Sequence, residues 1–229
     1  MNRALRIPEL VHLICREVAA PRPDDGGFRG GLGLKQSRDL AILARTCTTT
    51  SDIALDVLWE NIRTIVNLMY CLPSDLCRRD GSLRRRVRPS DSARIVLHTA
   101  RARELDVRDA GFPDHIDPVA LLETLDLVVP TLDLFPNLRH LTWHLDEDGA
   151  MDVLPRLLSP GIINIELGPF RSLPNLTVLA TLTASCPVLT KAIIHHGSQD
   201  PPSIVSFLPL SILQLSLVFN PSTLKRLAF

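Results

Sequence analysis

The stretch LRHLTWH, residues 138–144, has apolar side chains at its first, fourth and sixth positions. In a strand, the fourth and sixth residues point to one face, and the residues beside them point to the other. The stretch therefore predicts a strand with one buried face and one polar face. The same 1-4-6 spacing occurs at Ala102, Leu105 and Val107; at Leu138, Leu141 and Trp143; at Ile162, Ile165 and Leu167; at Leu189, Ala192 and Ile194; and at Ile212, Leu215 and Leu217.

The intervals between these stretches indicate a repeat. From residue 138 onward they start 24, 27 and 23 residues apart, which is typical of leucine-rich repeats with one strand and one helix per unit. The first interval is 36 residues long and needs an insertion around residues 111–117. Helical patterns of leucine and valine fill residues 117–130, 151–158 and 173–187. We therefore expect an α/β repeat fold, an irregular solenoid with parallel strands inside and helices outside.

The polar residues of the predicted strands form a candidate surface for binding a protein target. Alternation along each strand places them opposite the apolar residues. They are Arg139, His140, Thr142, His144, Asn164, Glu166, Lys191 and Gln214. An extended concave face suits protein recognition. The alternative interpretation of these residues is ordinary solvated strand surface.

Three short helices are predicted before residue 63. In IPELVHLICREV, residues 7–18, Pro8 suits the first helical position and Glu9 interacts favourably with the helix dipole. The apolar stripe of this helix consists of Leu10, Leu13, Ile14 and Val18. SRDLAILARTC, residues 37–47, and SDIALDVLWENI, residues 51–62, give the second and third helices. Three helices of this size form a marginal core alone and are expected to lean on a partner or on the rest of the chain.

These three segments, in this order, resemble the F-box, the three-helix module that docks a Skp-type adaptor in cullin–RING ubiquitin ligases. ALDVLWENI, residues 54–62, with RPSDSARIVLHTARARELDV, residues 88–107, is similar to F-box and leucine-rich-repeat proteins common in basidiomycete (mushroom-forming) fungi. One departure is the glycine-rich segment between the first two helices, which is longer than in a minimal F-box. The resemblance implies that the first helix is a docking face. The expected adaptor-binding residues are Ile7, Pro8, Leu10, Leu43, Leu55 and Trp59.

The resemblance and the repeats together predict three parts. These are an F-box over residues 4–66, a helical and arginine-rich connector over residues 67–100, and irregular leucine-rich repeats over residues 101–229. The last repeat is expected to be incomplete, because the apolar stripe that begins at Leu224 and Leu227 stops at Phe229. The implied function is that of the substrate-recognition subunit of a Skp–cullin–F-box ubiquitin ligase. Such a subunit is a non-enzymatic adaptor: its repeats bind a protein target, and the ligase chemistry lies in other subunits.

Two other interpretations remain open. The N-terminal helices could merely cap a leucine-rich-repeat scaffold, with their apolar stripe wholly internal. The six arginines between Arg78 and Arg88 could form a nucleic-acid patch. That patch lacks interleaved aromatic residues for base stacking, and acidic residues return within a few positions. A solvated connector, with some arginines paired to acids on the flanking modules, is therefore favoured over a nucleic-acid site.

The composition argues against several other classes of function. Lysine and arginine total 25, as do aspartate and glutamate, so no net charge draws the chain to nucleic acid or to a membrane. No apolar run approaches the roughly 18 residues of a spanning helix, and no signal peptide is recognisable. Five cysteines without a CxxC pair indicate reduced thiols in the cytoplasm and/or nucleus. No motif predicts a catalytic residue, a cofactor or a metal; His140 and His144 would lie about 13 Å apart on one strand face.

Overall fold

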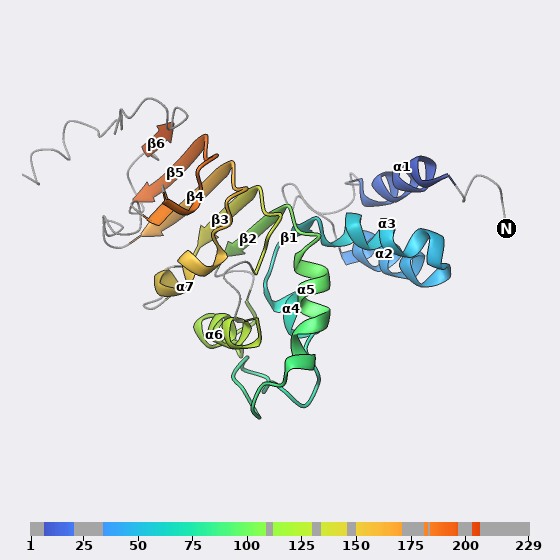
Figure 1. The fold of residues 1–229 in the computed structure, drawn as a ribbon, viewed down its shortest axis with the longest axis horizontal. Helices are drawn as coiled ribbons and strands as arrows, with labels where there is room; N and C mark the ends of the chain where they lie inside the picture. The colour runs from blue at the N-terminus through green and yellow to red at the C-terminus, as the bar shows by residue number, and fades with distance from the viewer. Residues whose placement is uncertain are drawn as a thin grey trace, which may run out of the picture.

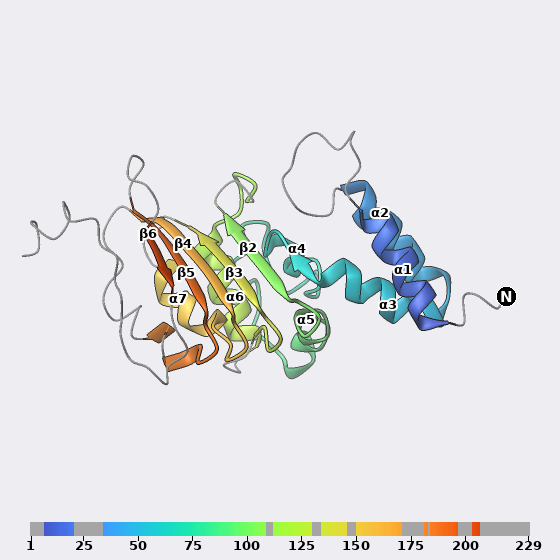
Figure 2. The same ribbon diagram turned by 90° about the horizontal axis from the view of Figure 1, so that it is seen from above.

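The fold is α/β, with a cluster of three helices beside a six-stranded sheet (Figures 1 and 2). The computed structural model describes residues 7–20, 34–108, 112–129, 134–145, 150–170, 181–182, 184–196 and 203–206. The strand predicted at residues 212–217, including Gln214, lies outside these residues, as does the end of the last predicted repeat. None of the helices in the described ranges has the length and apolar character that a membrane crossing needs.

The strands follow one another across the sheet in chain order. They are β1 (Asn61–Ile62), β2 (Glu104–Arg108), β3 (His140–His144), β4 (Asn164–Phe170), β5 (Lys191–His196) and β6 (Ser203–Ser206). The first five are parallel, and β6 pairs antiparallel with β5. Parallel neighbours need a crossover between them, and a helix usually makes it. The predicted parallel strands at residues 102–107, 138–143, 162–167 and 189–194 are therefore confirmed as β2 to β5.

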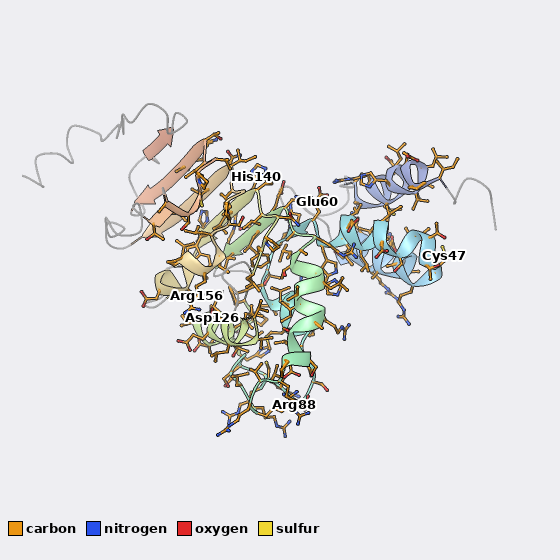
Figure 3. All side chains as sticks on the ribbon, viewed as in Figure 1. Cys47, Glu60, Arg88, Asp126, His140 and Arg156 are labelled. Atoms are coloured by element: carbon orange, nitrogen blue, oxygen red, sulfur yellow. The ribbon has the colours of Figure 1, made fainter. Side chains whose placement is uncertain are left out.

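The crossovers place helices on one face of the sheet (Figure 1). They contain α4 (Val66–Met69), the 3-10 turn η2 (Pro89–Ser92), α5 (Ala93–Thr99), α6 (Pro118–Val128) and α7 (Ala150–Leu157). The carboxylate of Asp117 caps α6 by accepting hydrogen bonds from the backbone N–H groups of Val119 (2.9 Å) and Ala120 (3.1 Å). Neighbouring helices are also linked, because Arg156 of α7 donates to Asp126 of α6 at 2.5 Å (Figure 3).

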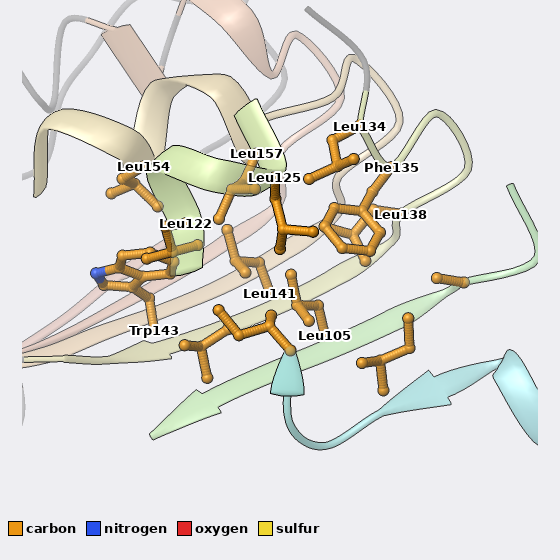
Figure 4. Packing of buried hydrophobic residues seen from close by; sticks show 14 of the residues in the cluster. Leu105, Leu122, Leu125, Leu134, Phe135, Leu138, Leu141, Trp143, Leu154 and Leu157 are labelled. Carbon is orange, nitrogen blue, oxygen red and sulfur yellow. The ribbon is translucent and has the colours of Figure 1, made fainter. Parts of the chain in front are cut away.

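The main hydrophobic core lies between the sheet and these helices. Its strand side includes eleven of the predicted 1-4-6 residues, which are buried: Ala102, Leu105, Val107, Leu138, Leu141, Trp143, Ile162, Ile165, Leu167, Leu189 and Ala192. From α6 and α7, Leu122, Leu125, Leu154 and Leu157 pack against them (Figure 4). Each leucine that is fully buried contributes roughly 1.5–3 kcal/mol relative to exposure. The 1-4-6 spacing thus identified the residues that hold the sheet to its helices.

One backbone arrangement recurs at the start of the strands. The carbonyl of Glu60 accepts hydrogen bonds from the N–H groups of Arg103 and Glu104, at 2.8 and 2.9 Å. The carbonyl of Arg103 does the same for residues 139 and 140, that of Arg139 for residues 163 and 164, and that of Ile163 for residues 190 and 191. Each unit is therefore fixed to the next by an equivalent pair of hydrogen bonds, beginning at Glu60.

The three N-terminal helices form a cluster with a small core of its own. They are α1 (Pro8–Ala19), α2 (Leu34–Thr46) and α3 (Thr48–Trp59). The core of this helical cluster consists of Val11, Cys15, Leu40, Ala54 and Val57. The predicted helix through Ile62 is wrong at its end, because Asn61 and Ile62 pair with Glu104 and Leu105 as β1. The second helix also begins earlier than predicted, at Leu34.

Candidate functional site

Most of the predicted apolar stripe of α1 is turned toward solvent, but Val18 packs against the core of the helical cluster. Val11 and Cys15 point into the helical cluster, whereas Ile7, Leu10, Leu13 and Ile14 are 45%, 40%, 63% and 43% exposed. The helix is apolar on two sides, and the small core of the cluster has room for only one of them. A contiguous set of exposed large apolar side chains is typical of a surface that another protein covers. A shallow depression of about 490 Å³ on this surface reaches from Pro8 and Leu13 to Ile53 of α3.

The structure places the residues predicted to bind an adaptor in different environments. Pro8 and Leu10 of α1 and Ile7, which precedes it, are exposed, and Leu43 and Leu55 are half-buried on α2 and α3. Trp59 lies elsewhere: it packs against the core of the sheet and stacks on His98. The sequence-derived set also left out Leu13 and Ile14, although the helical period placed both of them on the stripe. We call Ile7, Leu10, Leu13 and Ile14 the α1 stripe.

The helical cluster is joined to the sheet by charged side chains. Arg16 of α1 makes a two-pronged ion pair with Glu60, with N–O distances of 2.6 and 2.8 Å. Arg101, which precedes β2, pairs with Asp52 at 3.0 Å and also with Asp56, both on α3. These contacts join residues 44 or more positions apart, so no local sequence pattern predicts them.

The face of the sheet opposite α6 and α7 carries polar side chains, among them His140 (Figure 3). The register aligns Glu104, His140, Asn164 and Lys191 in the first row and Asp106, Thr142, Glu166 and Ile193 in the second. We call these two rows the polar rows. Seven of the eight predicted target-binding residues lie in the described ranges, and five of them stand in these rows. They are His140, Thr142, Asn164, Glu166 and Lys191.

Hydrogen bonds order several side chains of this face. Asn164 and His140 share a hydrogen bond of 2.9 Å across neighbouring strands, and Asn61 donates to Glu104 at 2.6 Å. His144, at the end of β3, lies 3.3 Å from the carboxylate of Glu166. Side chains held in this way present a fixed set of donors and acceptors, which favours specific recognition over loose contact.

Arg139 is the predicted target-binding residue that the structure places differently. It precedes β3, and its guanidinium donates to the carbonyl of Gly161 at 3.0 Å. A methyl group in place of a Gly161 hydrogen would lie 3.2 Å from that guanidinium, so glycine leaves space for this contact. Arg139 thus links two turns between repeats and stands outside the polar rows.

The arginine-rich connector is organised by one residue of the six. Arg85 forms a two-pronged pair with the buried carboxylate of Asp91, at 2.7 and 3.1 Å, and a second pair with Asp75 at 2.7 and 3.2 Å. The hydrogen bond from Arg85, with another from the N–H of Arg88, lowers the pKa of Asp91 to about 2. Arg85 thus pairs with acids, as the sequence predicted for some connector arginines, but Asp75 and Asp91 lie within the connector and not on the flanking parts. The other five arginines are exposed.

Thiols and possible metal ligands are separated from one another across the described residues. Those residues contain no group of three or more His, Cys, Asp or Glu side chains that could hold a metal ion. All five cysteines are free thiols. Burial raises the pKa of the Cys186 thiol to about 11, whereas hydrogen bonds with Thr50 lower the pKa of Cys47.

Comparison of the chain with protein-family models, with curated proteins and with solved structures found no match.

Proposed function

We propose that this chain is the target-recognition subunit of a Skp–cullin–F-box type ubiquitin ligase. The observation that carries the proposal is the exposed α1 stripe, at the end of the molecule away from the polar rows of the sheet (Figure 2). The α1 stripe would bind a Skp-type adaptor and through it a cullin, while the polar rows would bind a protein target. In this role the chain holds two proteins together, and other subunits supply the ligase chemistry.

The repeating architecture supports the target-binding half of the proposal. Parallel strands in chain order, helices on one face and equivalent hydrogen-bond pairs at Glu60, Arg103, Arg139 and Ile163 are what a leucine-rich-repeat solenoid would give. In such a solenoid the face without helices is available to a partner. The polar rows stand on that face.

The exposed α1 stripe favours docking over the runner-up function, a leucine-rich-repeat scaffold whose first helices only cap the solenoid. A cap would bury its apolar stripe against the first repeat. Here α1–α3 have their own core, and α1 is joined to the sheet unit by the charged pair of Arg16 with Glu60, whereas Arg101 and the packing of Trp59 join α3 to it. Leu13, the most exposed member of the stripe, is 63% exposed.

Co-purification with a Skp-type adaptor tests the proposal. Leu13→Asp places a charge at the centre of the α1 stripe and should weaken adaptor binding at least tenfold, because buried apolar anchors carry most interface energy. The matched control is Leu127→Asp on α6, since Leu127 is similarly exposed at 57%. Both variants are first shown to be folded by circular dichroism. If wild type fails to bind the adaptor, or if both variants bind equally well, the docking function is wrong and the scaffold is favoured.

A further inference from the structure

A groove runs along the junction between the helical cluster and the sheet. Its larger part is a depression of about 370 Å³, lined by Arg38 of α2, Trp59 of α3 and Tyr70 after α4. A smaller depression of about 140 Å³ adjoins it over β2 and β3. Asn61 and Arg63 line both depressions, so the two form one surface. We call this surface the junction groove.

The larger depression has the side chains that protein interfaces prefer. Tyr70, the one tyrosine in the sequence, is 78% exposed, although it follows an apolar segment that packs into the core. Trp59 and Leu58 also line this depression. Tryptophan, tyrosine and arginine are the residues most enriched among those whose truncation weakens protein–protein binding most. This end of the groove suits an apolar side chain of a partner.

The charges of the junction groove change sign along its length. The larger depression is lined by Arg38 and Arg63 and by no described carboxylate. The smaller one is lined by Glu104 and Asp106 as well as Arg63; because Arg108 pairs with Asp106 at 2.7 Å, Glu104 is its main negative charge. A ligand of uniform charge, such as a nucleic-acid strand, would be attracted at one end and repelled at the other. A peptide can place an acidic residue at the first end and a basic residue at the second.

We propose that the junction groove binds an extended peptide segment of a partner protein. The segment carries an acidic residue beside a large apolar residue, which contact Arg38, Tyr70 and Trp59, and a basic residue further along, which contacts Glu104. That this partner is the target of the ligase rests on the proposed function; the binding itself does not. The short β1 ends the sheet beside the groove and offers its backbone to an extended chain.

A phage-displayed library of random octapeptides, selected on the full chain, tests this inference. The expected enriched sequences have aspartate or glutamate next to a large apolar residue, with lysine or arginine a few positions away. Binding of an enriched peptide, measured by fluorescence anisotropy, should fall at least tenfold with Arg38→Glu and several-fold with Tyr70→Ala. Both residues are exposed, so the variants should keep the fold. Arg79→Glu, at an exposed arginine of the connector, should bind as wild type does.

Several outcomes would overturn the inference. One is a selection that enriches no pattern of opposite charges, and another is peptide binding that Arg38→Glu leaves unchanged. A third is tighter binding of a labelled single-stranded RNA 20-mer that competes with the peptide, because it would show the occupant to be nucleic acid. Adaptor binding is measured on the same proteins. Leu13→Asp should lose the adaptor and keep the peptide, so failure of the ligase function is distinguished from failure of the groove.

Discussion

The indole of Trp59, the last residue of α3, stacks on the imidazole of His98 in α5, with ring centroids 4.4 Å apart and ring planes at 20°. The contact joins the helical cluster to the layer of helices under the sheet. His98 is buried, and its Nδ1 has no hydrogen-bond partner among the described residues. Burial lowers the pKa of His98, and the positive charges of Arg101 and Arg94 lower it further.

This stacked pair predicts that stability falls in mild acid. In the unfolded chain His98 takes up a proton near its ordinary pKa of 6.5, whereas in the folded chain it resists protonation to a lower pH. The contribution of His98 to the free energy of unfolding is therefore complete above about pH 6.5. It is lost as the pH falls toward the pKa of His98 in the folded chain. Thermal unfolding at pH 7.5 and pH 5 should show a lower Tm at pH 5.

His98→Phe is the matched test of that assignment, because phenylalanine keeps the stacking and cannot be protonated. The drop in Tm between pH 7.5 and pH 5 should shrink in this variant. The carboxylates of Asp75, Asp80 and Asp91 have lowered pKa values and titrate below this pH range. An unchanged drop would show that another group causes the pH dependence.

Arg101→Met should loosen the helical cluster from the sheet. Methionine keeps the apolar stem of the side chain but loses the ion pairs with Asp52 and Asp56. Both carboxylates are largely exposed, so the loss should be only about 1–2 kcal/mol. Hydrogen exchange should become faster in α1–α3 and stay the same in β3 and β4. Arg78→Met, at an exposed arginine of the connector, should change neither.

Leu141→Ala should destabilise the main core by about 2–5 kcal/mol, because Leu141 is 1% exposed and the smaller side chain leaves a cavity. Leu127→Ala makes the same chemical change at a side chain that is 57% exposed and should cost within about 0.5 kcal/mol. Urea unfolding of both variants measures the difference. Equal costs would mean that β3 is packed more loosely than the structure shows.

Asp91→Asn should loosen the arginine-rich connector. The neutral amide cannot replace the two-pronged pair with Arg85, so the segment before η2 loses the contact that orders it. Limited trypsin digestion should cut faster after Arg84 and Arg86, with the fragments identified by mass spectrometry. Asp114→Asn, at an exposed carboxylate after the next strand, should digest as wild type does. Equal rates for both variants would assign the order of the connector to its apolar contacts instead.

The sequence predicted the sheet well and the junction poorly, for a physical reason in each case. In a strand with one buried face the apolar residues recur at every second position, so Leu141 and Trp143 predict β3 from the local sequence alone. The strand β1 has only two residues, of which Ile62 alone is apolar and buried, and this is too little for a pattern. Sequence reasoning therefore continued the preceding helix through it.

Of the candidate surfaces, too, one was predictable from local sequence and the others were not. Alternation along β3 and β4 predicted the polar rows, because a buried neighbour fixes the direction of each side chain. The exposure of Leu13 and the position of Trp59 at the junction between the helical cluster and the sheet depend on how α1 and α3 pack against other elements. Only the folded chain decides which of two apolar sides of α1 is buried.

Glu60 is the one residue between α3 and β1, and it is held on both sides. Its carboxylate is paired with Arg16 of α1, and its carbonyl accepts the N–H groups of Arg103 and Glu104 at the start of β2. With one residue of chain and contacts in both directions, Glu60 ties α1–α3 closely to the start of the sheet. In the proposed function this tie would act as a bracket, so that an adaptor bound at the α1 stripe would set the position and orientation of a target bound on the sheet.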